Sequence, residues 1–128
     1  NGGRALLLLQ SAGLIKLRSG VGYEATPIDV VSNPKKLKFV EIEAPQLPRS
    51  LDDTTASVIN AGYAFAANLT KKDQIVAEDN TSPYVNIIAV KKGRETDPSI
   101  VKYIEIFHTE PVKKFIEDKY KGQVVPAW

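Results

Sequence analysis

The residue types that the sequence lacks exclude several kinds of functional site. The 128 residues contain no cysteine, no methionine and a single histidine. Without cysteine the chain has no disulfide, no thiolate metal site and no cysteine nucleophile, and one histidine would leave a transition metal dependent on several carboxylates. We therefore expect neither a metal nor another cofactor. Because the chain has no initiator methionine, we expect Asn1 to arise by processing or truncation.

Long apolar runs and basic stripes are missing as well. The leucine run near the start has four residues, far short of the roughly 18 apolar residues that span a membrane. The net charge is only +2 and the lysines are scattered in pairs, which indicates solvated faces and argues against nucleic-acid binding. A hydrophobic content of 43% and a charged content of 25% are typical of a globular protein with a real core.

The beginning of the chain reads as a short helix with both ends marked. Asn1 is a good N-cap, the leucines are strong helix formers, and Gly13 suits the position just past the end. Arg4 falls in the first turn, where the helix dipole disfavours a cation. Nearby glycines, exposed N–H groups and a guanidinium could hold a carboxylate or phosphate. The alternative is an ordinary exposed arginine.

Hydrophobic periodicity predicts both strands and helices in the rest of the chain. Apolar or alternating runs predict strands at residues 37–43, 56–60, 75–77 and 87–90, and a short strand or surface loop at 14–22. Helical turns or helices are predicted at residues 27–31, 47–51, 62–67, 98–107 and about 109–121. Asp97 and Pro98 supply a cap and a first-turn proline, and Gly122 ends the last helix.

Two asparagines stand at strand ends, where α/β folds bind ligands. Asn60 follows an apolar strand and precedes a helix, although it could be a plain N-cap. Asn86 opens the strand at residues 87–90. If these strands are antiparallel, both amides and Arg4 converge at one edge of the sheet. Amides beside a guanidinium suit a zwitterion such as an amino acid.

Catalytic alternatives are weaker. Glu41 and Glu43 alternate along a predicted strand at a spacing that a glycosidase could use, but any strand with a wet face looks the same. The adjacent acids Asp52 and Asp53 suit a turn or cap. The single histidine, His108, lies between the two predicted tail helices and is interpreted as a junction residue.

Four segments resemble a known family: residues 1–10, the phrase Glu-Ala-Pro-Gln-Leu-Pro-Arg-Ser-Leu-Asp-Asp at 43–53, Val-Ile-Asn at 58–60 and Ser-Pro-Tyr-Val-Asn at 82–86. They are similar to the NlpA family, the methionine-binding lipoproteins of bacterial ABC importers, and the likeness extends from end to end. It implies a type II periplasmic-binding-protein-like α/β fold of two lobes that close by a hinge, in which this chain starts partway. Residues 1–88 would form the second ligand-binding lobe, and residues 89–128 a return strand and C-terminal helices of the first.

The resemblance also implies roles for individual residues. Arg4 would clamp the carboxylate of the ligand, and Asn60 and Asn86 would hold its amino and carboxylate groups. Residues expected beside the ligand are Asn1, Gly3, Tyr63 and Tyr84. The side chains that grip the thioether would belong to the missing part. Ala61 and Gly62 stand where the family varies, so the resemblance leaves the exact ligand open.

The function implied is recognition and delivery without catalysis. The protein would capture L-methionine, a related amino acid or a short peptide, and hand it to the permease of an ABC importer. It would sit at the cell envelope, on the outer face of the cytoplasmic membrane or in the periplasm, anchored by a lipid on an N-terminal cysteine absent from this chain. The alternatives are a ligand-sensing effector domain on the same fold and an enzyme using Glu41 and Glu43. We also expect the chain alone to bind weakly, and to dimerise or swap its tail helices.

Overall fold

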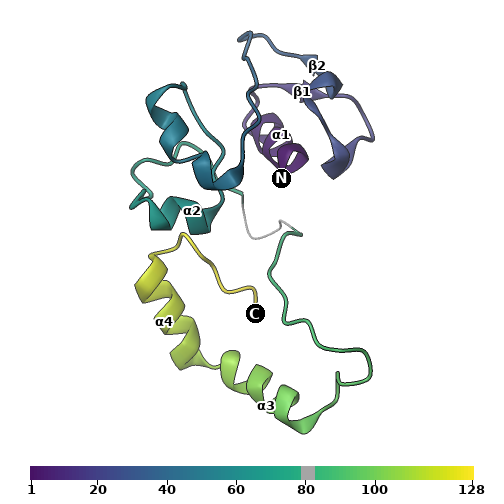
Figure 1. Cartoon of the computed structure of the whole chain (residues 1–128), viewed down its shortest axis with the longest axis vertical. Coiled ribbons are helices and arrows are strands. Elements are labelled where there is room, and N and C mark those ends of the chain that lie inside the picture. Colours follow the sequence, from purple (N-terminus) through teal and green to yellow (C-terminus); the bar gives the residue numbers. More distant parts are fainter. Residues whose placement is uncertain (79–82) are drawn as a thin grey trace. The chain divides into compact units, whose positions relative to one another are not determined.

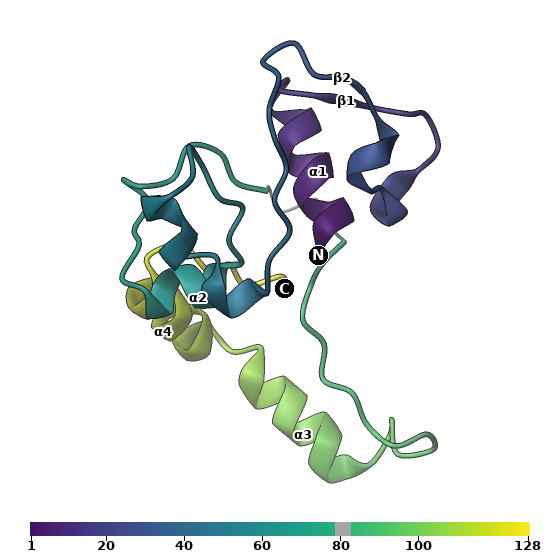
Figure 2. The same ribbon diagram turned by 45° about the horizontal axis from the view of Figure 1, so that its top comes forward.

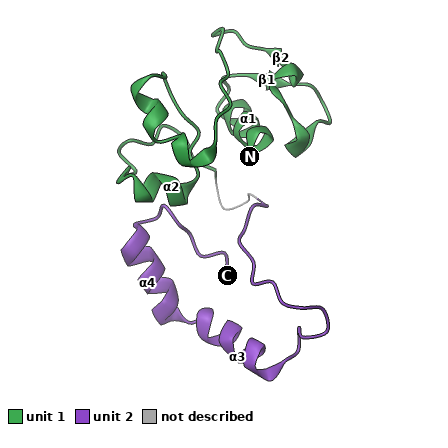
Figure 3. Cartoon of the chain, viewed as in Figure 1, with its two compact units in different colours: residues 1–78 green, residues 79–128 purple. Residues whose placement is uncertain are grey.

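The computed structural model describes residues 1–78 and 83–128. The chain divides into two units, Asn1–Glu78 and Asp79–Trp128, which are coloured separately in Figure 3. The lobe boundary expected between residues 88 and 89 stays a prediction. The α-helices and strands of both units are labelled in Figure 1.

The first unit begins with helix α1 (Gly2–Ser11), as the sequence predicts. Asn1 occupies the N-cap position, and its carbonyl accepts from the Ala5 N–H at 3.0 Å, although its side chain makes no capping bond. Gly13 follows the helix with a φ of +71°, a conformation that glycine adopts without strain. Both predicted ends of the helix are confirmed.

A small antiparallel hairpin packs beside α1. Strand β1 (Lys16–Leu17) pairs with β2 (Val30–Ser32), and the 3-10 turns η1 (Gly22–Glu24) and η2 (Pro27–Asp29) lie between them. The predicted strand or loop is confirmed, and the predicted helical turn is confirmed over residues 27–29 but gives way to β2 at residues 30–31. Figures 1 and 2 both show α1 against this hairpin. The core between them is formed by the buried residues Leu6, Ile15, Leu17 and Ala25.

The contact between α1 and the hairpin depends on a glycine. A Cβ added to Gly3 would lie 2.0 Å from the carbonyl oxygen of Tyr23 and 3.1 Å from that of Ala25. No side chain fits at such distances, and a backbone carbonyl cannot rotate away as a flexible side chain could. Gly3 is therefore required for α1 to approach the segment that follows β1.

An ion pair joins the residue after β1 to the residue before β2. The Arg18 guanidinium donates to the Asp29 carboxylate, which also accepts from the backbone N–H and hydroxyl of Thr26, each at 2.9 Å. The hydrogen bond from Arg18, followed by those from Thr26, lowers the pKa of Asp29 from 3.8 to about 2.

Short helical turns complete the first unit. They are η3 (Ala44–Gln46), η4 (Arg49–Asp52) and helix α2 (Ala61–Ala66). The Ser50 hydroxyl donates to the Leu47 carbonyl at 2.7 Å and bonds to the Ser57 hydroxyl at 3.2 Å, which ties η4 to the segment that follows it. The helical pieces predicted at residues 47–51 and 62–67 are thus confirmed, as is the turn role of Asp52 and Asp53.

Four predicted strands are wrong. Residues 37–43, 56–60, 75–77 and 87–90 are described without strand structure, and the β1–β2 ladder is the one sheet within the described ranges. Several apolar side chains in these segments are open to solvent, including Val40 at 70% and Ile87 at 79% exposure, although Leu37 and Phe39 pack against the core. A strand needs a neighbour for its N–H and C=O groups, and apolar alternation does not say whether that neighbour is present.

The second unit contains two tail helices at the predicted positions, α3 (Pro98–Phe107) and α4 (Glu110–Tyr120). His108 is the C-cap of α3, which confirms its reading as a junction residue, and its ring stacks on Trp128 at 4.8 Å between centroids. Gly122 follows α4 with a φ of +80°. None of the described helices has the length and apolar character to cross a membrane.

Candidate ligand site at the start of the first helix

Arg4 projects from the first turn of α1 and meets a carboxylate from the far end of the unit. Its Nε donates to Glu78 Oε1 at 2.7 Å, and one of its Nη atoms donates to Glu78 Oε2. The two side chains are 28% and 26% exposed. Two parallel N–H···O bonds to two different oxygens fix the plane of the guanidinium as well as its position.

Glu78 explains how a cation is tolerated at this end of the helix. The first turn of α1 carries no acidic residue, and its N–H groups already present partial positive charge. An arginine there is mildly unfavourable unless an anion lies nearby. The Glu78 carboxylate supplies that anion from 74 positions away in the sequence.

Asn1 and Asn60 come together in the same region. Asn60 occupies the N-cap position of α2, but its side chain makes no capping bond. Its Nδ2 instead donates to Oδ1 of Asn1 at 3.5 Å, which is a long contact. The interpretation of Asn60 as a capping residue is therefore right for the backbone and wrong for the side chain. Asn1 lies three positions before Arg4, a spacing that places both on one side of the helix start.

The other residues predicted to contact the ligand do not join the group formed by Arg4, Asn1 and Asn60. Gly3 is buried, and its contact with Tyr23 accounts for the glycine without a ligand. Tyr63 lies in α2 and is 40% exposed. Tyr84 and Asn86 are exposed residues of the second unit. The convergence of Arg4, Asn60 and Asn86, and the ligand roles of all these residues, stay predictions.

A depression on the first unit does not coincide with this group. An open depression of about 880 Å³ is lined by residues that include Gln10, Ile15, Leu17, Val31 and Pro34. None of its lining residues is a predicted ligand contact. It lies at the other end of α1, beside the hairpin, and its charged lining residues are the cations Lys16 and Arg18.

The alternative chemical sites gain no support from their surroundings. Glu41 and Glu43 are both exposed, as a solvated face requires. The Oε1 of Glu41 lies 2.8 Å from the place where a Cβ on Gly2 would stand, so its carboxylate rests against the start of α1. Within residues 1–78 and 83–128, no group of three or more histidine, cysteine, aspartate or glutamate side chains could hold a metal ion.

Sequence reasoning missed Glu78. No local pattern links residues this far apart, and a single glutamate after an apolar stretch is unremarkable. The signal that could have pointed to it is Arg4 itself, because a cation in a first turn implies an anion somewhere close. Only the tertiary structure shows which residue supplies that anion.

Comparison with known proteins identifies the family. The model of the NlpA lipoprotein family matches residues 1–128. The chain belongs to the NlpA lipoprotein family. The chain is also 47% identical to the D-methionine-binding lipoprotein MetQ of Escherichia coli (strain K12), in an alignment covering 100% of this chain and 48% of the relative.

Solved structures agree with this membership and show the fold. A nutrient binding protein from Burkholderia cenocepacia, bound to methionine, matches with a TM-score of 0.91 and 47% identity over 100% of this chain and 55% of that one. The substrate binding protein of a methionine transporter from Streptococcus pneumoniae matches with a TM-score of 0.85 and 43% identity, over 100% of this chain and 51% of that one. The NlpA chain thus has the type II fold of periplasmic substrate-binding proteins, and it spans about half the length of the relatives it matches.

Proposed function

We propose that this chain is part of the substrate-binding component of an ABC importer that captures methionine, or a closely related amino acid or short peptide, and delivers it to the membrane permease. Membership of the NlpA family and the methionine-bound relative support this proposal. The relatives are named as lipoproteins, which favours a site of action at the cell envelope, with a lipid anchor outside this chain. The mechanism is recognition and release, with no covalent step.

The observation that carries the proposal is the oriented Arg4 guanidinium at the start of α1, beside the amides of Asn1 and Asn60. A guanidinium binds a carboxylate through charge-assisted hydrogen bonds of roughly 1.5–3 kcal/mol each. Amides can accept from an ammonium group and donate to a carboxylate. In this proposal Arg4 holds the carboxylate, and Asn60 with Asn86 holds the remaining polar groups of the amino acid.

The direct test is calorimetric titration of the full-length gene product with L-methionine. The wild-type protein is expected to bind, and Arg4→Ala to bind at least about tenfold more weakly, a loss of about 1.4 kcal/mol or more. Arg94→Ala is the matched control, since Arg94 pairs with Asp97 in the second unit, outside the predicted site. Equal affinities of wild type and Arg4→Ala for L-methionine would show that Arg4 does not bind the ligand carboxylate.

Delivery needs a separate measurement, because a ligand-sensing domain on the same fold would also bind methionine. Membrane vesicles carrying the importer are expected to accumulate methionine only when this protein and ATP are present. Binding without any dependence of uptake on the protein would favour the sensing role.

A further inference from the structure

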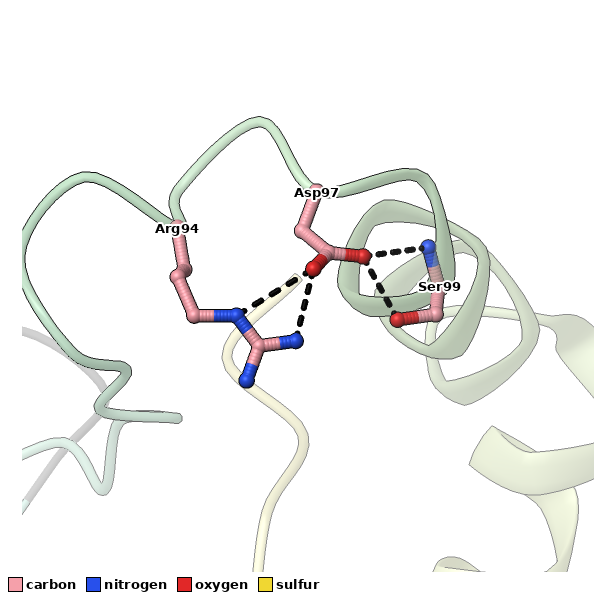
Figure 4. Close-up of polar contacts among 3 residues, drawn as sticks. All are labelled: Arg94, Asp97 and Ser99. Atoms are coloured by element: carbon pink, nitrogen blue, oxygen red, sulfur yellow. Dashed lines mark hydrogen bonds and ion pairs between the residues drawn. The ribbon is translucent and has the colours of Figure 1, made fainter.

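The Arg4–Glu78 pair differs from the other arginine pairs of the described residues in a way that bears on ligand recognition. Glu78 offers one oxygen to Nε and the other to an Nη atom of Arg4. In the second unit, Arg94 uses its Nε and an Nη atom as well, at 3.2 and 2.6 Å, but both bonds end on the single oxygen Oδ2 of Asp97 (Figure 4). The other Asp97 oxygen caps α3 through Ser99.

The geometric difference has a mechanical consequence. Two bonds to two oxygens resist both rotation of the guanidinium in its plane and tilting out of it, whereas two bonds to one oxygen leave a pivot. Arg4 is also 28% exposed on its side chain, against 56% for Arg94. The Arg4 guanidinium is therefore held in one orientation by a partner that does not belong to its own helix.

We propose that Glu78 is a positioning residue for ligand capture: by gripping the Nε edge of Arg4 it aims the outer Nη edge of the guanidinium at the carboxylate of the amino-acid ligand. This inference rests on the proposed function, since it concerns the same arginine. Glu78 itself does not touch the ligand. Its contribution reaches the ligand only through Arg4.

Two opposing effects decide the sign of this contribution. An arginine side chain has many rotamers, and part of that freedom is lost when it binds a carboxylate. Glu78 removes that freedom before the ligand arrives. Against this, the Glu78 charge repels the ligand carboxylate, but across the width of a guanidinium at a partly exposed site this repulsion is screened by solvent. We take pre-orientation to be the larger effect. The negative charge of Glu78 also offsets the unfavourable helix dipole at Arg4.

The test uses Glu78→Gln in the full-length gene product, titrated with L-methionine and with methioninamide, whose carboxylate is blocked. Wild type comes first, because its failure to bind methionine would refute the proposed function and not the positioning role alone. If wild type binds, Glu78→Gln is expected to lose about tenfold in methionine affinity and less than about twofold in methioninamide affinity. General damage to the fold would weaken both ligands equally, and that outcome overturns the proposal, as does unchanged or tighter methionine binding.

A double-variant cycle and a matched control isolate the route through Arg4. In an Arg4→Gln background, adding Glu78→Gln is expected to change methionine affinity by less than about twofold, because no guanidinium remains to be aimed. An undiminished tenfold loss in that background contradicts the proposal. Glu105→Gln makes the same substitution in an exposed ion pair with Lys102, 3.2 Å long, and is expected to leave methionine affinity unchanged.

A spectroscopic readout follows the pair without any ligand. The Nε–H signal of Arg4 in a ¹⁵N NMR spectrum, assigned by its loss in Arg4→Lys, is expected to shift in Glu78→Gln and to exchange faster with water. The Nε–H signal of Arg94 is expected to stay in place. An Arg4 signal unaffected by Glu78→Gln would overturn the positioning role even if methionine binds to the wild type.

Discussion

The two units of the chain hold their charged pairs in opposite ways. In the first unit, Arg4 finds Glu78 from 74 positions away, and α1 closes over a small buried core. In the second unit, Arg94 pairs with Asp97 three residues on, and no residue of 83–128 is buried. The same guanidinium and carboxylate groups are thus placed by packing in one unit and by local sequence in the other.

This difference predicts where single substitutions do harm. Changes that disturb packing are expected to disable the first unit. Equivalent changes in the second unit are expected to be mild in this chain, because its helices depend on caps and on their own hydrogen bonds. Four measurements on the 128-residue chain can break or sharpen the comparison.

Gly3→Ala is expected to have the largest effect. Its Cβ would stand 2.0 Å from a backbone oxygen, so α1 must move away from the hairpin. We expect a loss of about 3 kcal/mol in the free energy of unfolding, measured by urea denaturation with circular dichroism. Gly62→Ala in α2 is the control, because nothing lies within 4 Å of its added Cβ, and a gain of up to about 1 kcal/mol is expected there. Equal effects of the two alanines would disprove the close approach at Gly3.

Leu6→Ala is expected to rank next. Leu6 is 5% exposed in the core of the first unit, and truncation removes buried surface and leaves a cavity, at a cost of about 2 kcal/mol. Ile106→Ala in α3 is the counterpart in the second unit. Because Ile106 is 55% exposed, its loss is expected to cost less than about 0.5 kcal/mol. Trp128, the single tryptophan, reports on the second unit by fluorescence. A large Ile106→Ala effect would mean that α3 is covered in solution.

Acid is expected to have the smallest effect. The pKa of Asp29 lies at about 2 in the folded chain against an ordinary value of 3.8, so between these values the unfolded state binds more protons. Stability from the Arg18–Asp29 pair is therefore complete above about pH 4 and is lost as the pH falls towards 2. Asp29→Asn is expected to flatten this dependence in urea titrations at several pH values.

The second unit offers a local counterpart to that titration. Hydrogen bonds from Ser99 and then Arg94 hold the pKa of Asp97 below its usual range. Acid is therefore expected to weaken the start of α3 as well, over a pH range below the ordinary aspartate value. A far-UV signal from Asp97→Asn that still follows pH as in wild type would assign the acid response to the first unit alone.

Some residues of the candidate site could be predicted from the sequence, and others could not. Arg4, Asn1 and Asn60 could be singled out because helix starts and strand-to-helix junctions carry recognisable residues. Glu78 could not, because its partner lies in a remote part of the chain. The reason for Gly3 was also hidden, since the carbonyl of Tyr23 that excludes a side chain approaches only in the folded unit.

The sequence by itself determined α1, α3 and α4, together with their ends at Gly13, Asp97 and Gly122. A helix satisfies its hydrogen bonds within its own segment, so capping residues and periodicity suffice to place it. Tertiary structure alone decided which apolar runs became strands, which carboxylate holds Arg4, and which glycine lets α1 pack. Strands, ion pairs and close contacts each need a partner from elsewhere in the chain, and the partner of Arg4, Glu78, lies 74 residues away.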